Sequence, residues 1–153
     1  MSRLELMVPP DLVWVLVAVL MWLASIKTPR VSLPSPLRVT VAVALTIIGV
    51  WAMVAARVSL ERAQTTWSPM APRRTTSLVT SGVYGLSRNP IYLGMLLVML
   101  GFAVALASPA AAVLSALFVL YLNRFQIVPE ERVLAASLGQ EYVDYVQRVR
   151  RWI

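Results

Sequence analysis

The sequence has 153 residues, of which 59% are hydrophobic and 14% charged, with a mean hydropathy of +0.74 and a net charge of +7. This composition is too apolar for an ordinary soluble domain and indicates a protein of the lipid bilayer. The chain lacks cysteine and histidine, which excludes disulfides, thiolate nucleophiles, and the commonest general base and transition-metal ligand. The same lack of ligands leads us to expect no metal. Its basic residues lie between and after the apolar runs, so we expect no nucleic-acid partner.

Two apolar runs in the first part of the chain predict two membrane-spanning helices. Residues 12–26 follow two prolines and Asp11, and an aspartate can cap the free amides at a helix start. A signal peptide is the alternative for this run because Arg3 precedes it, but the acidic residues and the prolines disfavour that alternative. Residues 37–56 are long enough for a full span, and we expect the two spans to form a tight helical hairpin.

Two shorter apolar runs follow a long polar stretch. Residues 91–107 and 110–122 are joined only by Ser108 and Pro109, so we expect a second antiparallel hairpin. The intervening residues 57–89 contain no run that could cross a bilayer. The sequence therefore predicts an all-α, polytopic integral membrane protein with four transmembrane helices in two hairpins.

The distribution of basic residues predicts the orientation of these spans. With four crossings, eleven basic residues fall on the side of the termini and the central polar stretch, and three fall on the opposite side. Because cytoplasmic loops carry the excess of lysine and arginine, we expect the termini and residues 57–89 in the cytoplasm. We expect the membrane to be the inner (plasma) membrane of a prokaryote.

The C-terminal segment has the pattern of an amphipathic helix. After Asn123, apolar and tyrosine side chains recur at helical spacing, at Leu134, Leu138, Tyr142, Tyr145 and Val149. Gly139 is expected to break this segment into two short helices. Basic residues at its end favour a position on the membrane surface, in contact with anionic lipid headgroups.

Three polar features lie at the predicted cytoplasmic ends of the last two spans: the loop at residues 78–84, the junction at residues 88–92 and the doublet Glu130-Glu131. A tight hairpin brings them together. Singly, each residue has a structural explanation: Arg88 as a membrane anchor, Tyr92 as an interfacial aromatic, and the glutamates as first-turn acids. Together they need a further explanation, because ionisable groups near the apolar layer are costly.

The same features carry a resemblance to a known family. T-S-G-V-Y begins at Thr80, R-N-P-I-Y begins at Arg88, and L-G-Q-E-Y-V-D-Y follows the glutamate doublet. In this order they resemble the isoprenylcysteine carboxyl methyltransferases and, more distantly, the phospholipid N-methyltransferases, over residues 76–152. The resemblance implies an S-adenosylmethionine site over the cytoplasmic helix ends and a lipophilic or lipidated acceptor that enters from the bilayer. We therefore expect residues 1–56 to be an N-terminal transmembrane hairpin and residues 57–153 a methyltransferase-like core.

The resemblance also implies site residues. Those that would line the cofactor pocket are Leu78, Val79, Tyr84, Arg88, Asn89, Pro90, Tyr92, Glu130 and Glu131. Within this set, the candidate catalytic residues are Arg88, Asn89, Tyr92 and Glu130. A carboxylate of the doublet can hold the cofactor's ammonium and Arg88 can pair with its carboxylate, while the tyrosines offer faces for adenine or the sulfonium.

Two positions depart from the family pattern. Asn89 stands where the family usually has histidine, and an asparagine cannot titrate, so we expect no acid-base role there. The family's acceptor-side arginine falls on Gln126, which leaves Arg124 as the nearest cation. Arg124 and Gln126 are therefore the candidate acceptor-binding residues.

Three functions remain open at this point. A carboxylate acceptor is ionised at neutral pH, so its methylation requires positioning and water exclusion but no general base. We rank this reaction, on an isoprenylcysteine-like acceptor, before N-methylation of an aminophospholipid or other membrane amine, which must first lose a proton. The alternative of another class is a non-catalytic membrane module. Gly94 and Gly101 suit close helix packing in every case, whereas cofactor binding would separate the alternatives.

Overall fold

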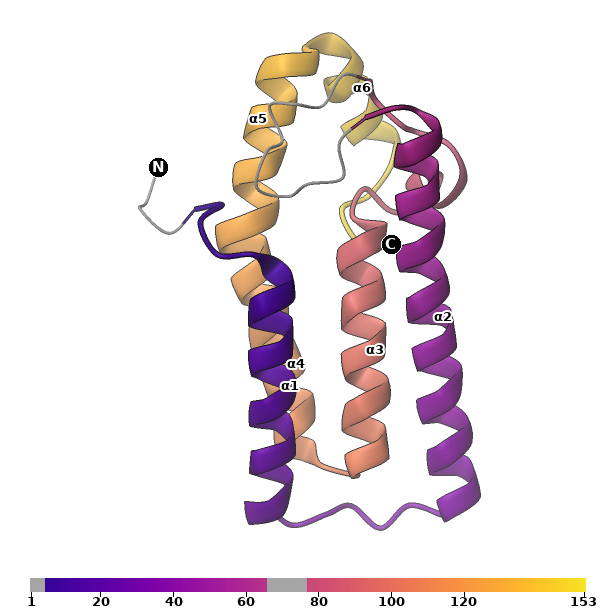
Figure 1. The fold of residues 1–153 in the computed structure, drawn as a ribbon, viewed down its shortest axis with the longest axis vertical. Helices are drawn as coiled ribbons and strands as arrows, with labels where there is room; N and C mark the ends of the chain where they lie inside the picture. Colours follow the sequence, from indigo (N-terminus) through magenta and orange to yellow (C-terminus); the bar gives the residue numbers. More distant parts are fainter. Residues whose placement is uncertain (1–4, 66–76) are drawn as a thin grey trace.

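The computed structural model describes residues 5–65 and 77–153 (Figure 1). These residues form helices and connecting segments without a strand, which confirms the predicted all-α class. In chain order the elements are α1 (Pro10–Lys27), α2 (Ser35–Arg62), the 3-10 turn η2 (Gly82–Gly85), α3 (Pro90–Leu106), α4 (Pro109–Leu122), the π-helical turn η3 (Asn123–Ile127), α5 (Val128–Leu138) and α6 (Gln140–Arg148).

Three helices of the described chain are long and apolar enough to cross a membrane. They are α1, α2 and one continuous helix, Pro109–Leu138, which comprises α4, η3 and α5. Large hydrophobic side chains cover the exposed surfaces of α1, α2 and α4. The fourth apolar helix, α3, has 17 residues and is shorter. These helices indicate an integral membrane protein, while the four-span arrangement stays a prediction.

The helix ends follow from particular residues. Each of the four long helices has a proline in its first two positions, where the missing N–H would have no partner within the helix. Ala107, the residue that caps the end of α3, lies in the left-handed region, and the Ser108 hydroxyl accepts a hydrogen bond from the Ala111 amide at the start of α4. Gly139, at φ 58° and ψ −131°, separates α5 from α6 at the predicted position. The surface-lying role of this segment stays a prediction.

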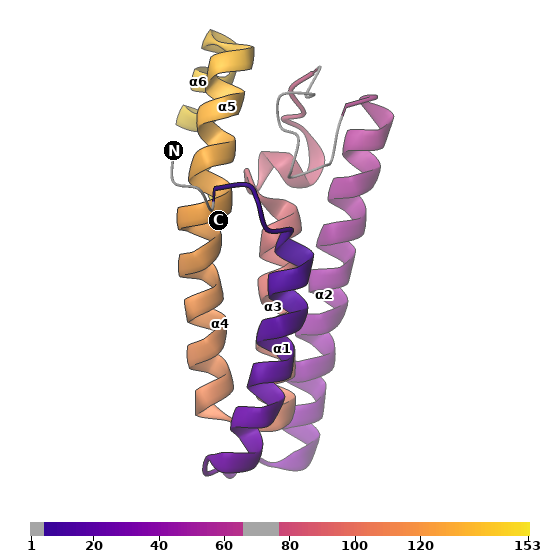
Figure 2. The same cartoon turned by 60° about the vertical axis from the view of Figure 1, so that its left-hand side comes forward.

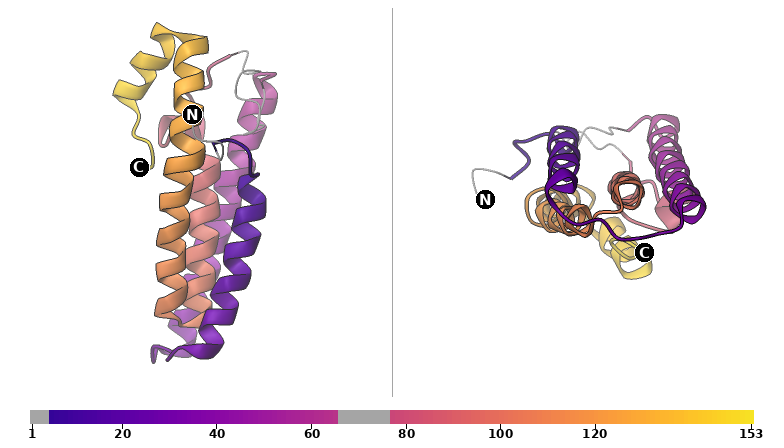
Figure 3. Two further views of the ribbon diagram at one scale, coloured as in Figure 1. Left: turned by 90° about the vertical axis from the view of Figure 1, so that its left-hand side faces the viewer. Right: turned by 90° about the horizontal axis from the view of Figure 1, so that it is seen from below.

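The four long helices pack in the order α1, α4, α3, α2, as the view from below in Figure 3 shows. α3 lies at the centre and contacts α2, α4 and α1. The sequence predicts a tight hairpin of the first two spans, but α1 and α2 make at most marginal contact with each other. Their connection crosses the far end of the bundle and bonds to the α3–α4 turn, where the Val31 amide donates to the Ala107 carbonyl at 2.8 Å.

Glycines explain why α2 packs on α3. A Cβ built on Gly49 would lie 2.6 Å from the Gly94 carbonyl oxygen, and a Cβ on Gly94 would lie 2.5 Å from the Gly49 carbonyl oxygen. Farther along, a Cβ on Gly101 would lie 2.8 Å from the Ala42 carbonyl oxygen. The two backbones approach this closely only because the interface lacks side chains there. The packing role predicted for Gly94 and Gly101 is thus observed, with partners on α2.

Two helices are longer than their apolar runs. α2 continues past residue 56 to Arg62, and the helix that begins at Pro109 continues past residue 122 to Leu138. Hydropathy marks the part of a helix that suits the bilayer, whereas a helix continues into water as long as its backbone bonds and packing allow. As a result α5 rises above the end of the bundle and carries the glutamate doublet with it (Figure 2).

Candidate active site

A cavity of about 430 Å³ lies at the end of the bundle where α2 ends and α3 begins. Its walls come from α1, α2, α3, α5, α6 and the segment before α3. The volume is within the roughly 300–1,000 Å³ typical of small-molecule sites. All the residues predicted for the cofactor pocket line this cavity: Leu78, Val79, Tyr84, Arg88, Asn89, Pro90, Tyr92, Glu130 and Glu131. The two residues predicted for the acceptor, Arg124 and Gln126, do not line it.

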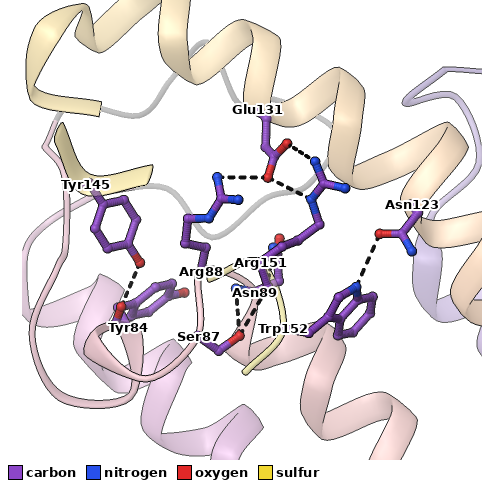
Figure 4. Close-up of polar contacts among 9 residues, drawn as sticks. All are labelled: Tyr84, Ser87, Arg88, Asn89, Asn123, Glu131, Tyr145, Arg151 and Trp152. Carbon is purple, nitrogen blue, oxygen red and sulfur yellow. Dashed lines mark hydrogen bonds and ion pairs between the residues drawn. The ribbon is translucent and has the colours of Figure 1, made fainter. Parts of the chain in front are cut away.

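Arg88 and Glu131 form an ion pair in the cavity wall. Arg88 Nη1 lies 3.1 Å from Glu131 Oε1, and both side chains are largely buried. Arg151, near the C-terminus, binds the same carboxylate through two bonds, with Nε 3.1 Å from Oε1 and Nη2 2.7 Å from Oε2 (Figure 4). These bonds raise the pKa of Arg151 above its usual value. Both oxygens of Glu131 are therefore already bound to arginines.

Glu130 is in a different situation. Its Oε2 accepts a hydrogen bond of 3.1 Å from the Tyr92 hydroxyl, which joins α5 to the start of α3. Within residues 5–65 and 77–153, no arginine or lysine forms an ion pair with Glu130. The cavity wall therefore includes an acid that no basic residue of the described chain neutralises.

Arg88 also has a donor nitrogen that no described residue binds. Its Nε is buried and has no hydrogen-bond partner among the residues that the structure describes. A buried charged donor without a partner is costly, and a bound anion would remove that cost. Arg88 and Glu130 thus line one cavity, the first with a buried donor and the second with an acid for which no described residue supplies an acceptor or a basic partner.

Two tyrosines of α6 complete the wall, and sequence reasoning did not assign them to the site. Tyr142 and Tyr145 are both buried and line the cavity, and the Tyr145 hydroxyl donates a 2.7 Å hydrogen bond to the Tyr84 carbonyl. Burial raises the pKa of Tyr142 and of Tyr145 to about 12, and it raises the pKa of Tyr84 above its usual range. All three phenols therefore remain neutral. The available signal is their helical spacing, which by itself predicts an amphipathic helix on the membrane surface.

Residues from the first two helices were also missed. Asp11 and Trp14 of α1, and Arg57 and Glu61 of α2, line the cavity. The Trp14 indole donates a 3.1 Å hydrogen bond to the carbonyl of Met95, which fixes α1 against α3. No motif marks these positions, so only the packing of the helices reveals them.

The candidate acceptor residues lie elsewhere. Arg124 is about half exposed, and its Nη1 pairs with Glu5 at 2.8 Å, while Arg132 approaches the same carboxylate at 3.5 Å. Gln126 is buried and hydrogen-bonds to Tyr92, so it contacts the site through that tyrosine. An acceptor role for Arg124 and Gln126 stays a prediction.

Comparison with known proteins supports a family assignment. The family model for phospholipid methyltransferases matches residues 37–141, which is more than half of the chain. An uncharacterized protein of Haemophilus influenzae is 40% identical over 63 residues, which are 41% of this chain and the whole of that protein.

Named relatives match about half of this chain. Protein-S-isoprenylcysteine O-methyltransferase B of Arabidopsis thaliana is 40% identical over 72 residues, which are 47% of this chain and 36% of that protein. The mouse protein-S-isoprenylcysteine O-methyltransferase is 41% identical over 75 residues, which are 49% of this chain and 26% of that protein. The match thus spans only a third or a quarter of these two relatives. No solved structure matches the chain significantly. By the extent of the family match, the chain belongs to the phospholipid methyltransferase family.

Proposed function

We propose that the protein is an S-adenosylmethionine-dependent membrane methyltransferase that acts on a lipophilic acceptor, by carboxyl O-methylation of an isoprenylcysteine-like group. The observation that carries this proposal is the cavity in which, among the residues that the structure describes, Glu130 has no basic partner and Arg88 Nε is a buried donor without an acceptor. The family match and the isoprenylcysteine methyltransferase relatives support the reaction class.

The residues present fit the cofactor. S-adenosylmethionine carries an ammonium, a carboxylate and a sulfonium, and when bound it supplies a methyl group on positively charged sulfur. Glu130 would hold the ammonium, and Arg88 Nε would donate to the carboxylate. The neutral tyrosines of the wall offer faces for the adenine ring or for the sulfonium.

The chain's own residues then act by positioning. A carboxylate acceptor is already ionised at neutral pH, so the reaction does not require a proton-accepting side chain, in agreement with the lack of histidine and cysteine. Holding the acceptor oxygen in line with the reacting carbon, and keeping water from that oxygen, are the contributions that a buried cavity makes. Tyr92 would keep Glu130 in place through its hydrogen bond.

The acceptor would reach the cavity from the bilayer. Beyond the polar end, the walls are apolar, with Val50, Met53 and Val54 on α2, Met95 on α3 and Trp14 on α1. α1 and α2 barely touch, although both line the cavity. A prenyl or acyl chain could therefore lie between these two helices while its polar end meets Arg88, Tyr92 and Glu130.

Methylation of a membrane amine is the second candidate, and a specific observation favours it. Asp11, in the first turn of α1, lines the same cavity, so that a second carboxylate besides Glu130 belongs to the wall near the acceptor's proposed route. Two carboxylates suit a cationic amine better than an anion, and one of them could accept its proton. The name of the matching family model agrees with this candidate as well.

Binding and turnover assays would test the proposal. Purified protein in nanodiscs should bind S-adenosylmethionine in a calorimetric titration, and absence of binding would favour a non-catalytic membrane module. Transfer of a labelled methyl group should then be compared for a farnesylated cysteine with a free carboxylate, the corresponding amide, and an aminophospholipid. We expect methylation of the free carboxylate. Methylation of the aminophospholipid alone would establish the amine reaction instead.

A further inference from the structure

The C-terminal segment, residues 149–153, lies against the start of α3 in an extended conformation. α6 ends at Arg148, and Val149 has the extended backbone angles φ −121° and ψ 130°. The Arg88 amide donates to the Arg150 carbonyl at 3.0 Å. The next carbonyl, that of Arg151, accepts from the Ser87 hydroxyl at 3.3 Å and from the Asn89 side-chain amide at 3.0 Å (Figure 4). Three consecutive residues before α3 are thus bound to two consecutive carbonyls of the segment.

Side chains of the same segment bind the helix that carries the glutamates. The Arg151 guanidinium makes its two bonds to Glu131 on α5, and the Trp152 indole donates to Asn123 Oδ1 at 3.3 Å. Trp152 also packs against the hydrophobic core. The segment therefore connects the junction before α3 to the α4–α5 helix, which are the two elements that supply Arg88 and Glu130.

The bonds that Glu131 accepts determine which donor atoms of Arg88 stay available to a ligand. A guanidinium and a carboxylate prefer two parallel hydrogen bonds. Here Arg151 makes that two-bond contact with Glu131, and Arg88 makes an ion pair through Nη1 alone, so that its Nε keeps no partner among the described residues. Without Arg151, Arg88 could make the two-bond contact with Glu131 itself. Its Nε would then be bound to that carboxylate and would not be available to a ligand.

We propose that Arg151 is a positioning residue of the cofactor site, which occupies Glu131 and thereby keeps Arg88 available to an anionic group of the ligand. This inference rests on the proposed function. It assigns a role to a C-terminal segment that the sequence pattern marks only as basic. The segment acts through Glu131 and Arg88 and does not itself line the cavity.

The first test compares two neighbouring arginines. Arg151→Gln should weaken S-adenosylmethionine binding by roughly tenfold or more in a calorimetric titration. Arg150→Gln is the matched control, because its side chain is exposed, the charge change is the same, and its carbonyl still accepts from Arg88. We expect the control to bind within roughly twofold of wild type. Equal binding by Arg151→Gln and wild type, or equal losses in the two variants, would overturn the inference.

The second test asks whether Arg151 acts through Glu131. In the double variant Arg151→Gln and Glu131→Gln, the losses should be smaller than the sum of the single losses, because both changes remove one interaction. Strictly additive losses would mean that Arg151 acts by another route and would overturn the proposal. Arg151→Lys, which keeps the charge without the planar fork, should recover only part of the affinity. Full recovery would replace positioning by a simple charge effect.

A third measurement does not depend on the ligand. Hydrogen exchange at the Arg88 amide should be faster in Arg151→Gln than in wild type and unchanged in Arg150→Gln. If wild-type protein fails to bind S-adenosylmethionine, the proposed function falls, while this comparison still shows whether Arg151 holds the junction. Unchanged exchange at Arg88 in Arg151→Gln would mean that it does not. If Arg151→Gln does not fold, Arg151→Lys takes its place in this comparison, with the same two outcomes.

Discussion

Two adjacent glutamates in the first turn of α5 have different partners. Glu131 is bound by Arg88 and Arg151, whereas Glu130 is bound by Tyr92. Neighbouring residues on an α-helix point about 100° apart, so the two carboxylates cannot share one partner set. The sequence predicts the doublet as a site element but cannot distinguish its members, because the arginine that binds Glu131 most closely comes from the end of the chain.

This difference predicts the effect of a neutral substitution. Glu130→Gln should weaken S-adenosylmethionine binding by about 2 to 4 kcal/mol, because a neutral amide cannot balance the ligand's ammonium in a partly buried site. Calorimetry on the folded variant would measure the loss. Glu141→Gln, at an exposed first-turn glutamate of α6, is the control and should leave the affinity unchanged. Unchanged affinity in Glu130→Gln would assign Glu130 to helix capping.

The ion-pair partner of Arg124 could not be predicted from the sequence. It is the nearest cation to the doublet on its amino-terminal side, so sequence reasoning assigns it to an anionic acceptor. In the structure its partner is Glu5, which is 119 positions away in the chain. Such a pair depends on the path of the whole chain and leaves no local pattern.

Arg124→Ala separates the two roles. If Arg124 meets the acceptor, the variant should bind S-adenosylmethionine within roughly twofold of wild type while the acceptor's KM rises or kcat falls. If it only anchors Glu5, kinetic constants should stay unchanged and the melting temperature should fall by a few degrees, since Glu5 would lose its 2.8 Å ion pair with Arg124. Parallel kinetics and thermal unfolding in nanodiscs would distinguish these outcomes.

At the scale of helices, the apolar runs predict where the chain crosses the bilayer but not how the helices pair. The centres of α1, α2, α3 and α4 agree with the runs in the sequence, and the break at Gly139 is as expected. The pairing differs, because α2 packs along α3 through glycines while α1 packs on α4. Hydrophobic content is similar on all sides of these helices, so it cannot indicate which side meets which partner.

The glycine contact between α2 and α3 predicts a specific destabilisation. Gly94→Ala should lower the free energy of unfolding by about 1 to 3 kcal/mol, because its Cβ would collide with the Gly49 backbone and the helices must separate. Thermal unfolding in detergent would measure the change. Ala105→Val adds bulk on the exposed side of the same helix and should change stability little. A Gly94→Ala protein as stable as wild type would contradict the close packing.

At the scale of the whole molecule, charge and architecture agree. The last turn of α2, the start of α3, α5 and α6 gather at one end of the bundle, and the α1–α2 and α3–α4 turns lie at the other (Figure 1). Most basic residues of the described chain belong to the first end. The sequence thus indicates which end carries the site, whereas the membership of α1 and α2 in its wall appears only in the folded chain.

The orientation of this bundle is open to a direct test. By the positive-inside rule, the end with the cavity should face the cytoplasm. An alkaline-phosphatase fusion after Ile153 should therefore be inactive, and a fusion within residues 28–34 should be active in intact bacterial cells. The opposite pair of results would reverse the topology and place the site on the outer side.

The helix Pro109–Leu138 has 30 residues and therefore a length of about 45 Å, against about 30 Å for the hydrocarbon layer of a bilayer. This helix begins at the α3–α4 turn, at the end of the bundle away from the cavity, and brings Glu130 and Glu131 into the cavity wall. We expect this helix to cross the bilayer, and a bilayer of different thickness would then change the tilt that the helix prefers. Because Glu130 is bonded to Tyr92 at the start of α3 and Glu131 to Arg88 just before it, we expect a change in tilt to act on those bonds. We therefore expect the geometry of the site to depend on lipid chain length.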